Sequence, residues 1–281
     1  MPKVRSADGL GIHYEVHDYT DPWIKPPTLI LQHGFGRTAR YWYHMIPYLA
    51  RQCRVICPTL RGLGESDGDI DLERGLTLDN YMADLNAVID DVGAESVHYV
   101  GESIGGILGY ALAALHPARV KSLTVMAAPL FIPPAVQQAF AFGHASWADA
   151  ILEMGTYEWC RRANGETRFP PGTDVRLVDW YAAESAKNRK EVMAALARFA
   201  CAADITGLIE RIEAPVLGLY PSAGSKVASD DQLATIKAKV KNLSIIHLPT
   251  PYHMVWVLYP GVCAGHIRHF IATREGIACP E

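Results

Sequence analysis

The chain has 281 residues, of which 49% are hydrophobic and 20% are charged. This composition is typical of a folded globular protein and excludes collagen, a coiled coil and long disorder. The formal net charge is −4, from 26 basic and 30 acidic residues, and the sequence lacks the basic stripe of nucleic-acid-binding proteins. No apolar run reaches the roughly 18 residues of a membrane span. We therefore expect neither nucleic acid nor a membrane as a partner.

The cysteines and the first residues of the sequence indicate the cellular compartment of the protein. Six cysteines are present, without a CxxC pair or metal-ligand spacing. Residues 1–17 lack the long apolar core of a signal peptide. We expect buried or inert thiols, no metal, no cofactor and a cytoplasmic location. A homodimer stays open at this point.

Short apolar segments predict the strands. In chain order they are Thr28–His33, Arg54–Cys57, Ser96–Val100, Val120–Met126, Pro215–Tyr220 and Leu243–Leu248. Such nearly continuous apolar runs are typical of strands that are covered on both faces, as in a parallel sheet.

Helical patterns lie between the predicted strands. Residues 78–92 place apolar side chains on one helix face, with Thr77 as the N-cap and Gly93 just past the end. Residues 104–116 form a second helical pattern, which stops before Pro117. The alternation predicts a mostly parallel α/β sheet flanked by helices.

Residues 131–204 break this alternation. The segment is mainly helical in pattern, is rich in aromatic residues and is punctuated by Pro133-Pro134 and Pro170-Pro171-Gly172. We predict that it forms an inserted helical cap over a core made of residues 1–130 and 205–281. The alternative is that it adds further helices to the core.

The strongest functional signal is the segment GESIG at 101–105, which follows a predicted strand and opens a predicted helix. A G-x-S-x-G motif in this setting is typical of a sharp strand-to-helix turn that presents a serine hydroxyl above the sheet edge. Glycine is needed at 101 and 105 because a side chain there would clash with neighbouring backbone. We predict Ser103 as a catalytic nucleophile.

A serine hydroxyl needs an adjacent base, and with this type of turn the base comes late in the chain. We expect His253, in the loop after the last predicted strand. His266 and His269 fall inside the helical pattern Val262–Ile271 and are expected on a helix surface. With His253 as the base, we expect activity to rise with pH through an ionisation near the ordinary histidine value of about 6.5.

Acyl transfer also needs two N–H donors for the oxyanion, about 3 Å from the developing charge. We predict the backbone N–H of Ile104, just after the nucleophile. The second donor is expected to be the N–H of Phe35, in the loop His33-Gly34-Phe35-Gly36 after the first predicted strand.

Several segments, in the right order, resemble the α/β-hydrolase superfamily. They are HGFGRTARYW for the oxyanion loop, RVICPTLRGLGES for the next strand, TLDNYMADLNAVIDDVGAESVHYVGESIGG for the elbow, HPARVKSLTVMAAP for the strand after it, DITGLIERIEAPVLGLY for the return to the core and PYHMVWVLYP for the histidine loop. Within the superfamily, the sequence is similar to cap-bearing esterases and enol-lactonases. The resemblance implies the α/β-hydrolase fold and hydrolysis of a carboxylic ester, lactone or amide through an acyl-enzyme.

Other functions remain open within this resemblance. One is a C–C bond hydrolase or a cofactor-free lyase or oxygenase on the same fold. Another is a non-catalytic binder of a small ligand with a degenerate triad. Haloalkane dehalogenases and epoxide hydrolases of this fold carry Asp as nucleophile, so Ser103 argues against both.

The sequence departs from the superfamily at the acid that orients the histidine. The loop after the Pro215–Tyr220 strand, residues 221–227, has no carboxylate, and neither does the end of the preceding strand, residues 126–129. Asp230 and Asp231 are the nearest substitutes, although Ser229-Asp230-Asp231 also has the pattern of a helix N-terminus. The further candidates are Glu184, Glu102, the hydroxyl of Ser222 or Ser225, and a backbone carbonyl; Asp204 is expected to cap a helix instead.

The substrate is expected to be a small molecule. The aromatic residues of the cap segment, together with Phe35, Tyr41 and Trp42, suggest a pocket for an apolar or aromatic acyl group, or else simply form core. Five arginines could meet a substrate carboxylate or lie on the surface: Arg37, Arg40, Arg161, Arg162 and Arg168.

Overall fold

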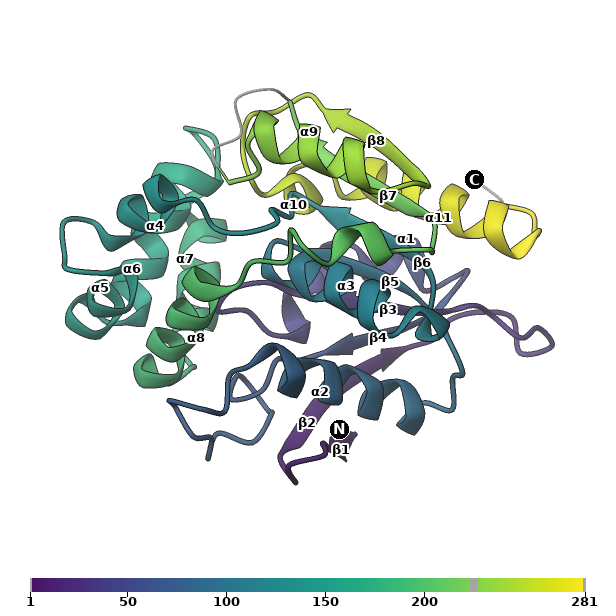
Figure 1. Ribbon diagram of the computed structural model, residues 1–281, viewed down its shortest axis with the longest axis horizontal. Helices are drawn as coiled ribbons and strands as arrows, with labels where there is room; N and C mark the ends of the chain where they lie inside the picture. Colours follow the sequence, from purple (N-terminus) through teal and green to yellow (C-terminus); the bar gives the residue numbers. More distant parts are fainter. Residues whose placement is uncertain (1, 223–226, 280–281) are drawn as a thin grey trace.

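The protein is built on one twisted sheet with the strand order β1-β2-β4-β3-β5-β6-β7-β8. The computed structural model describes residues 2–222 and 227–279 (Figure 1). β2 pairs antiparallel with β1 and β4, and every pair from β4 to β8 is parallel. The strands are β1 Lys3–Arg5, β2 Gly11–His17, β3 Thr28–Gln32, β4 Arg54–Pro58, β5 Val97–Glu102, β6 Val120–Met126, β7 Val216–Pro221 and β8 Leu243–Leu248.

The six predicted strands are confirmed to within two residues at each end as β3 to β8. β1 and β2 were not predicted. β2 alternates Ile12, Tyr14 and Val16 with polar residues, and it lies near the sheet edge with only β1 outside it. This period-2 pattern differs from the apolar runs by which the central strands are recognised.

Helices connect the parallel strands. They are α1 Ile46–Leu49, α2 Leu78–Asp91, α3 Ile104–Leu115, α4 Pro134–Ala141, α5 Trp147–Met154, α6 Thr156–Ala163, α7 Val175–Ser185, α8 Lys190–Ala202, α9 Asp230–Lys239, α10 Val255–Leu258 and α11 Pro260–Glu275. The predicted ends of α2 are confirmed, because the Thr77 side chain accepts a hydrogen bond from the N–H of Asn80 and Gly93 has a φ of 70°.

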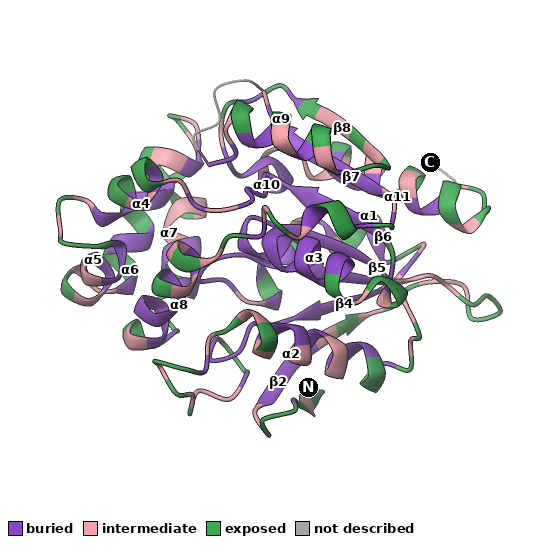
Figure 2. Cartoon of the chain, in the orientation of Figure 1, coloured by how far each residue is buried: buried purple, intermediate pink, exposed green. Residues whose placement is uncertain are grey.

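Alternate residues of the central strands point to opposite faces of the sheet and build two cores. In β3, Ile30 belongs to the core under α2 and α3, whereas Leu29 and Leu31 belong to the core under α1 and α11. Between these layers, every residue of β5 and β7 is buried (Figure 2). The sheet therefore holds the carboxyl ends of β3, β5 and β8 at one rigid edge.

The segment predicted as a cap contains α4 to α8, between β6 and β7, and forms the left part of Figure 1. Its two ends meet, because Phe131 and Asp204 form an antiparallel bridge and the N–H of Ile205 donates to Leu130 O at 3.1 Å. This is the arrangement expected of an insertion. That α4–α8 act as a movable cap, with the boundaries 131 and 204, stays a prediction.

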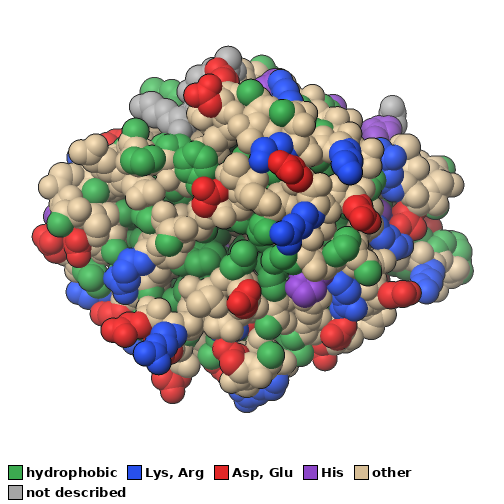
Figure 3. All heavy atoms as spheres, in the orientation of Figure 1, with side chains coloured by type: hydrophobic (Ala, Val, Ile, Leu, Met, Phe, Trp, Pro, Cys, Tyr) green, Lys and Arg blue, Asp and Glu red, His purple; other side chains and the backbone are tan. Residues whose placement is uncertain are grey.

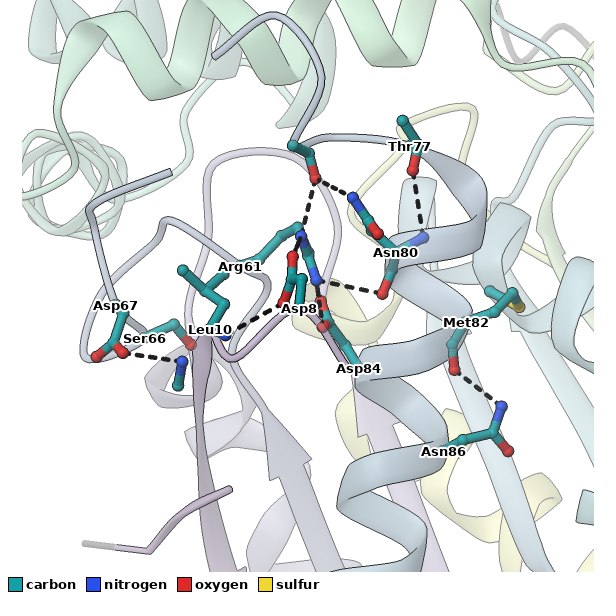
Figure 4. A network of polar contacts seen from close by, with 12 residues as sticks. Asp8, Leu10, Arg61, Ser66, Asp67, Thr77, Asn80, Met82, Asp84 and Asn86 are labelled. Atoms are coloured by element: carbon teal, nitrogen blue, oxygen red, sulfur yellow. Dashed lines mark hydrogen bonds and ion pairs between the residues drawn. The ribbon is translucent and has the colours of Figure 1, made fainter. Parts of the chain in front are cut away.

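A buried charge network ties the loop after β4 to α2 (Figure 4). The Arg61 side chain is fully buried and donates to both carboxylate oxygens of Asp84, at 2.6 and 2.7 Å, and to Asp8 at 2.8 Å. It also donates to the carbonyl of Gly75 at 2.9 Å. The desolvation of a buried charge is offset only by such complete pairing, so this network fixes the loop next to the candidate site.

The surface mixes charges of both signs. On the face in Figure 3, basic and acidic side chains are interspersed with apolar ones. No helix in the described part of the chain combines the length and the apolar character that a membrane crossing needs.

Candidate active site

Ser103 lies at the sharp turn between β5 and α3. Its backbone has φ 52° and ψ −120°, a conformation that L residues rarely adopt. The turn is tight: a Cβ on Gly101 would overlap the backbone of Gly105, and one on Gly105 would overlap the carbonyls at the end of β3. The glycine requirement inferred from the sequence is therefore confirmed. The strained serine is 8% exposed at the carboxyl end of β5.

Glu102, the residue before Ser103, joins the turn to the loop after β3. Its side chain is 1% exposed, and the same carboxylate oxygen accepts hydrogen bonds from the N–H of Gly34 and the guanidinium of Arg37. Burial opposes the charge of Arg37, but the carboxylate of Glu102 outweighs this and raises the pKa of the guanidinium. Glu102 thus holds the predicted oxyanion loop against the predicted nucleophile.

His33 fixes the start of the same loop. Its Nδ1 lies 2.9 Å from Gly34 O, and its Nε2 accepts the N–H of Leu60 at 3.1 Å. These contacts require a neutral ring with the proton on Nδ1, and burial lowers the pKa of His33 to about 3. Phe35 follows with its ring against Trp147 and Trp159, at centroid distances of 4.5 and 5.3 Å. The N–H groups of Phe35 and Ile104 as oxyanion donors stay a prediction.

His253 lies between β8 and α10 and is 6% exposed. Its ring packs edge-on against Trp256 at 5.6 Å. The Nδ1 atom is buried and has no hydrogen-bond partner among the described residues. Burial, followed by the charges of Arg37 and Arg168, holds the pKa of His253 well below its ordinary value. The ordinary histidine value of about 6.5 therefore does not apply to His253 in this structure, because the ring is desolvated and faces cations. The pH dependence of activity itself stays a prediction.

Arg37 links the two halves of the site. It pairs with Glu102, next to Ser103, and also donates to the sulfur of Met254, next to His253, at 3.0 Å. Its guanidinium lies 5.1 Å from the ring centroid of Trp256. The structure thus brings the serine turn and the histidine loop against one guanidinium. No hydrogen bond between the Ser103 hydroxyl and the His253 ring is among those of the described residues.

Comparisons with known proteins identify the fold to which this arrangement belongs. A family model described as the alpha/beta hydrolase fold matches residues 27–163. The chain has the α/β-hydrolase fold. A hydrolase from Pseudomonas aeruginosa PA01 superposes with a TM-score of 0.82 at 22% identity, over 96% of this chain and 97% of that one. The enol-lactonase from Burkholderia xenovorans LB400 does so with a TM-score of 0.76 at 20% identity, over 96% and 100%.

A sequence relative covers nearly the whole chain. The 3-hydroxybutyrate-oligomer hydrolase of Cupriavidus necator is 28% identical over 271 residues, which are 89% of this chain and 90% of that protein. The superfamily match and this relative support a hydrolase. The neighbours at 20% and 22% identity support the fold alone.

None of the acids proposed from the sequence contacts His253. Asp230 and Asp231 are exposed in the first turn of α9, where Ser229 forms the N-cap, so the alternative of a helix N-terminus is confirmed. Glu184 pairs with Arg40 and Lys187, and Glu102 turns to the oxyanion loop.

The other groups considered from the sequence do not provide the orienting group of His253 in the described part of the chain. Ser222 donates its N–H to Thr250 O at 2.8 Å, and Ser225 lies outside the described residues. Asp204 accepts the N–H of Thr206 in a turn rather than capping a helix. Since His253 Nδ1 has no partner in the described chain, no described carboxylate, hydroxyl or carbonyl serves as its orienting group.

The five arginines divide into two groups. Arg40, Arg161 and Arg162 pair with acidic side chains at the surface. Arg37 and Arg168 are buried, at 3% and 5% exposure. Arg168 ends the short π-helix Asn164–Arg168 that follows α6. In the sequence, Arg168 does not fall on the apolar face of a helical pattern or of a strand pattern. Its burial could therefore not be predicted.

One cavity lies beside the site rather than on it. It has a volume of about 890 Å³ and is lined by His13, Glu15 and His17 of β2, by Thr38 and Arg40, and by Trp180 and Glu184 of α7. Ser103 and His253 do not line it. Both side chains are largely buried. The alternation His-x-Glu-x-His in β2 supplies three of the polar side chains that line this cavity.

Proposed function

We propose that the protein is a serine hydrolase that cleaves a small carboxylic ester, lactone or amide through an acyl-enzyme. The observation that carries the proposal is the strained backbone of Ser103 at the strand-to-helix turn. A non-glycine residue persists in such a conformation only where the surroundings enforce it, and such strain gathers at active sites. The similarity to a 3-hydroxybutyrate-oligomer hydrolase favours an ester among these substrates, because hydroxy acids are joined to one another by ester bonds.

The residues divide the chemistry as follows. Ser103 Oγ attacks the substrate carbonyl, and His253 takes its proton and passes it to the leaving group. The N–H groups of Phe35 and Ile104 bind the oxyanion, and water then hydrolyses the acyl-enzyme. His253 is neutral at pH 7 because its pKa is held low. It is therefore ready to accept a proton, although it is a weaker base than a histidine beside a carboxylate.

A fluorophosphonate probe followed by intact mass tests this proposal. We expect one adduct on the native protein and none on Ser103→Ala. His253→Ala is expected to label at least about 10²-fold more slowly, the scale of general-base catalysis. A folded native protein that is not labelled, or one labelled equally in Ser103→Ala, contradicts the proposal.

The second candidate is a small-ligand binder with a degenerate triad. The buried Nδ1 of His253 favours it, because this atom lacks the partner that fixes the tautomer of a catalytic histidine. In serine proteases, neutralising the carboxylate that orients the histidine lowers kcat by about 10⁴-fold. A binder predicts saturable ligand binding with no adduct on Ser103 and no turnover.

A further inference from the structure

Arg168 is a buried cation that pairs with no carboxylate of the described residues. It is 5% exposed, and its only side-chain hydrogen bond among the described residues goes to the neutral Oδ1 of Asn164, at 3.2 Å. Its guanidinium lies 5.4 Å from the ring centroids of Phe140 and Trp159. Aromatic faces compensate a buried cation only in part. Burial lowers the pKa of Arg168 to about 10, so the side chain is still charged at pH 7.

This cation lies against the catalytic loops. Trp159 contacts both Arg168 and the ring of Phe35, the predicted oxyanion residue. The backbone carbonyl of Arg168 accepts the N–H of Met254, the neighbour of His253, at 3.4 Å. The charge of Arg168 acts on His253, Arg37 and Glu102. Arg168 therefore belongs to the same site as the serine and the histidine.

The charges of this site do not balance. Arg37 and Arg168 contribute two positive charges, and Glu102 contributes one negative charge that is already engaged by Arg37. One positive charge is left over in a desolvated environment. Burying an unpaired charge is costly, and natural proteins keep such a charge where a ligand neutralises it.

We propose that the substrate of this site carries a carboxylate, in addition to the bond that is cleaved, and that Arg168 binds it. The inference rests on the proposed hydrolase function and names its substrate class, an anionic ester or lactone. One excess charge matches one carboxylate, whereas a phosphate monoester would bring about two. A guanidinium also presents paired N–H donors in the plane that a carboxylate accepts.

The test uses two esters that differ in one charge and one methyl group, 4-nitrophenyl hydrogen glutarate and its methyl ester. We expect the native protein to prefer the anionic ester by about 30-fold or more in kcat/KM, the scale of a charge-assisted hydrogen bond. Arg168→Gln removes this preference, and Arg168→Lys keeps part of it. The matched control is Arg161→Gln, an exposed arginine of α6 paired with Asp179, which leaves the preference unchanged.

A binding measurement separates failure of this inference from failure of the hydrolase proposal. Glutarate is titrated calorimetrically into the native protein, Arg168→Gln and Arg161→Gln, with thermal unfolding to confirm that each variant is folded. Binding that disappears only in Arg168→Gln supports the carboxylate site even if neither ester is hydrolysed. Equal kcat/KM for the two esters in a protein that does hydrolyse them, or glutarate binding that survives in folded Arg168→Gln, overturns the inference. Absence of glutarate binding to the native protein overturns it as well.

Discussion

Arg37 and Glu102 form a buried ion pair that fastens the loop after β3 to the turn that carries Ser103. The pair also reaches the histidine loop, through the contact between Arg37 and the sulfur of Met254. Three segments that are far apart in the sequence, around residues 34, 102 and 254, are thus held by one guanidinium. The second buried arginine, Arg168, has no such anionic partner among the described residues.

Arg37 and Arg168, the two buried arginines of the candidate site, predict opposite effects on stability. Arg37→Met leaves Glu102 buried and uncompensated, so we expect a loss of about 3–5 kcal/mol in the free energy of unfolding. Arg168→Met removes a lone buried cation, so we expect no loss, or a gain on the order of 1 kcal/mol. Urea unfolding at pH 7 measures both. If Arg168→Met were destabilised as much as Arg37→Met, Arg168 would have a structural role and would not be a ligand-binding residue.

The pH dependence of activity follows from the burial of His253. Its pKa is held well below about 6.5, and the base must be neutral to act, so kcat/KM of the free enzyme is expected to stay level from pH 8 to below 6. A bound carboxylate beside Arg168 would offset the positive field and raise the pKa of His253. With the anionic ester, the acid limb of kcat is therefore expected at higher pH than that of kcat/KM. An inflection of kcat/KM near 6.5 would contradict this account of the site.

The same lowered pKa links stability to pH. Below about pH 6.5, His253 binds a proton in the unfolded chain but not in the folded chain. The free energy of unfolding therefore falls as the pH falls. We expect His253→Gln to lose less stability than the native protein between pH 7 and 5 in urea unfolding, because it lacks this linked protonation. The control is His269→Gln, an exposed position on α11, which is expected to behave like the native protein.

Arg61 offers a test of the scaffold away from the chemistry. Asp84→Asn removes the carboxylate that binds Arg61 through two oxygens, and we expect a loss of about 3 kcal/mol in the free energy of unfolding. Asp8→Asn removes a partner that is 41% exposed, and its effect is expected to stay below about 1 kcal/mol. Equal effects of the two substitutions in urea unfolding would contradict the burial argument.

Much of the fold could be predicted because local patterns specify it. The apolar runs of β3 to β8, the Thr77 cap and the glycines around Ser103 each have a local physical cause. The strand β2 was missed because its alternation is short and polar on one face. The environment of His253 could not be predicted, since its burial and the nearby charges of Arg37 and Arg168 come from segments more than 80 residues away.

The central claim is that Ser103 becomes acylated, and direct trapping of the acyl-enzyme tests it best. The native protein is mixed with excess 4-nitrophenyl hydrogen glutarate, quenched in acid within milliseconds to seconds, and digested for peptide mass analysis. The account predicts a glutaryl adduct on the peptide that contains Ser103, which forms with a burst of 4-nitrophenol and is absent in Ser103→Ala. Steady release of 4-nitrophenol with no adduct on this peptide, or undiminished turnover by Ser103→Ala, would contradict it.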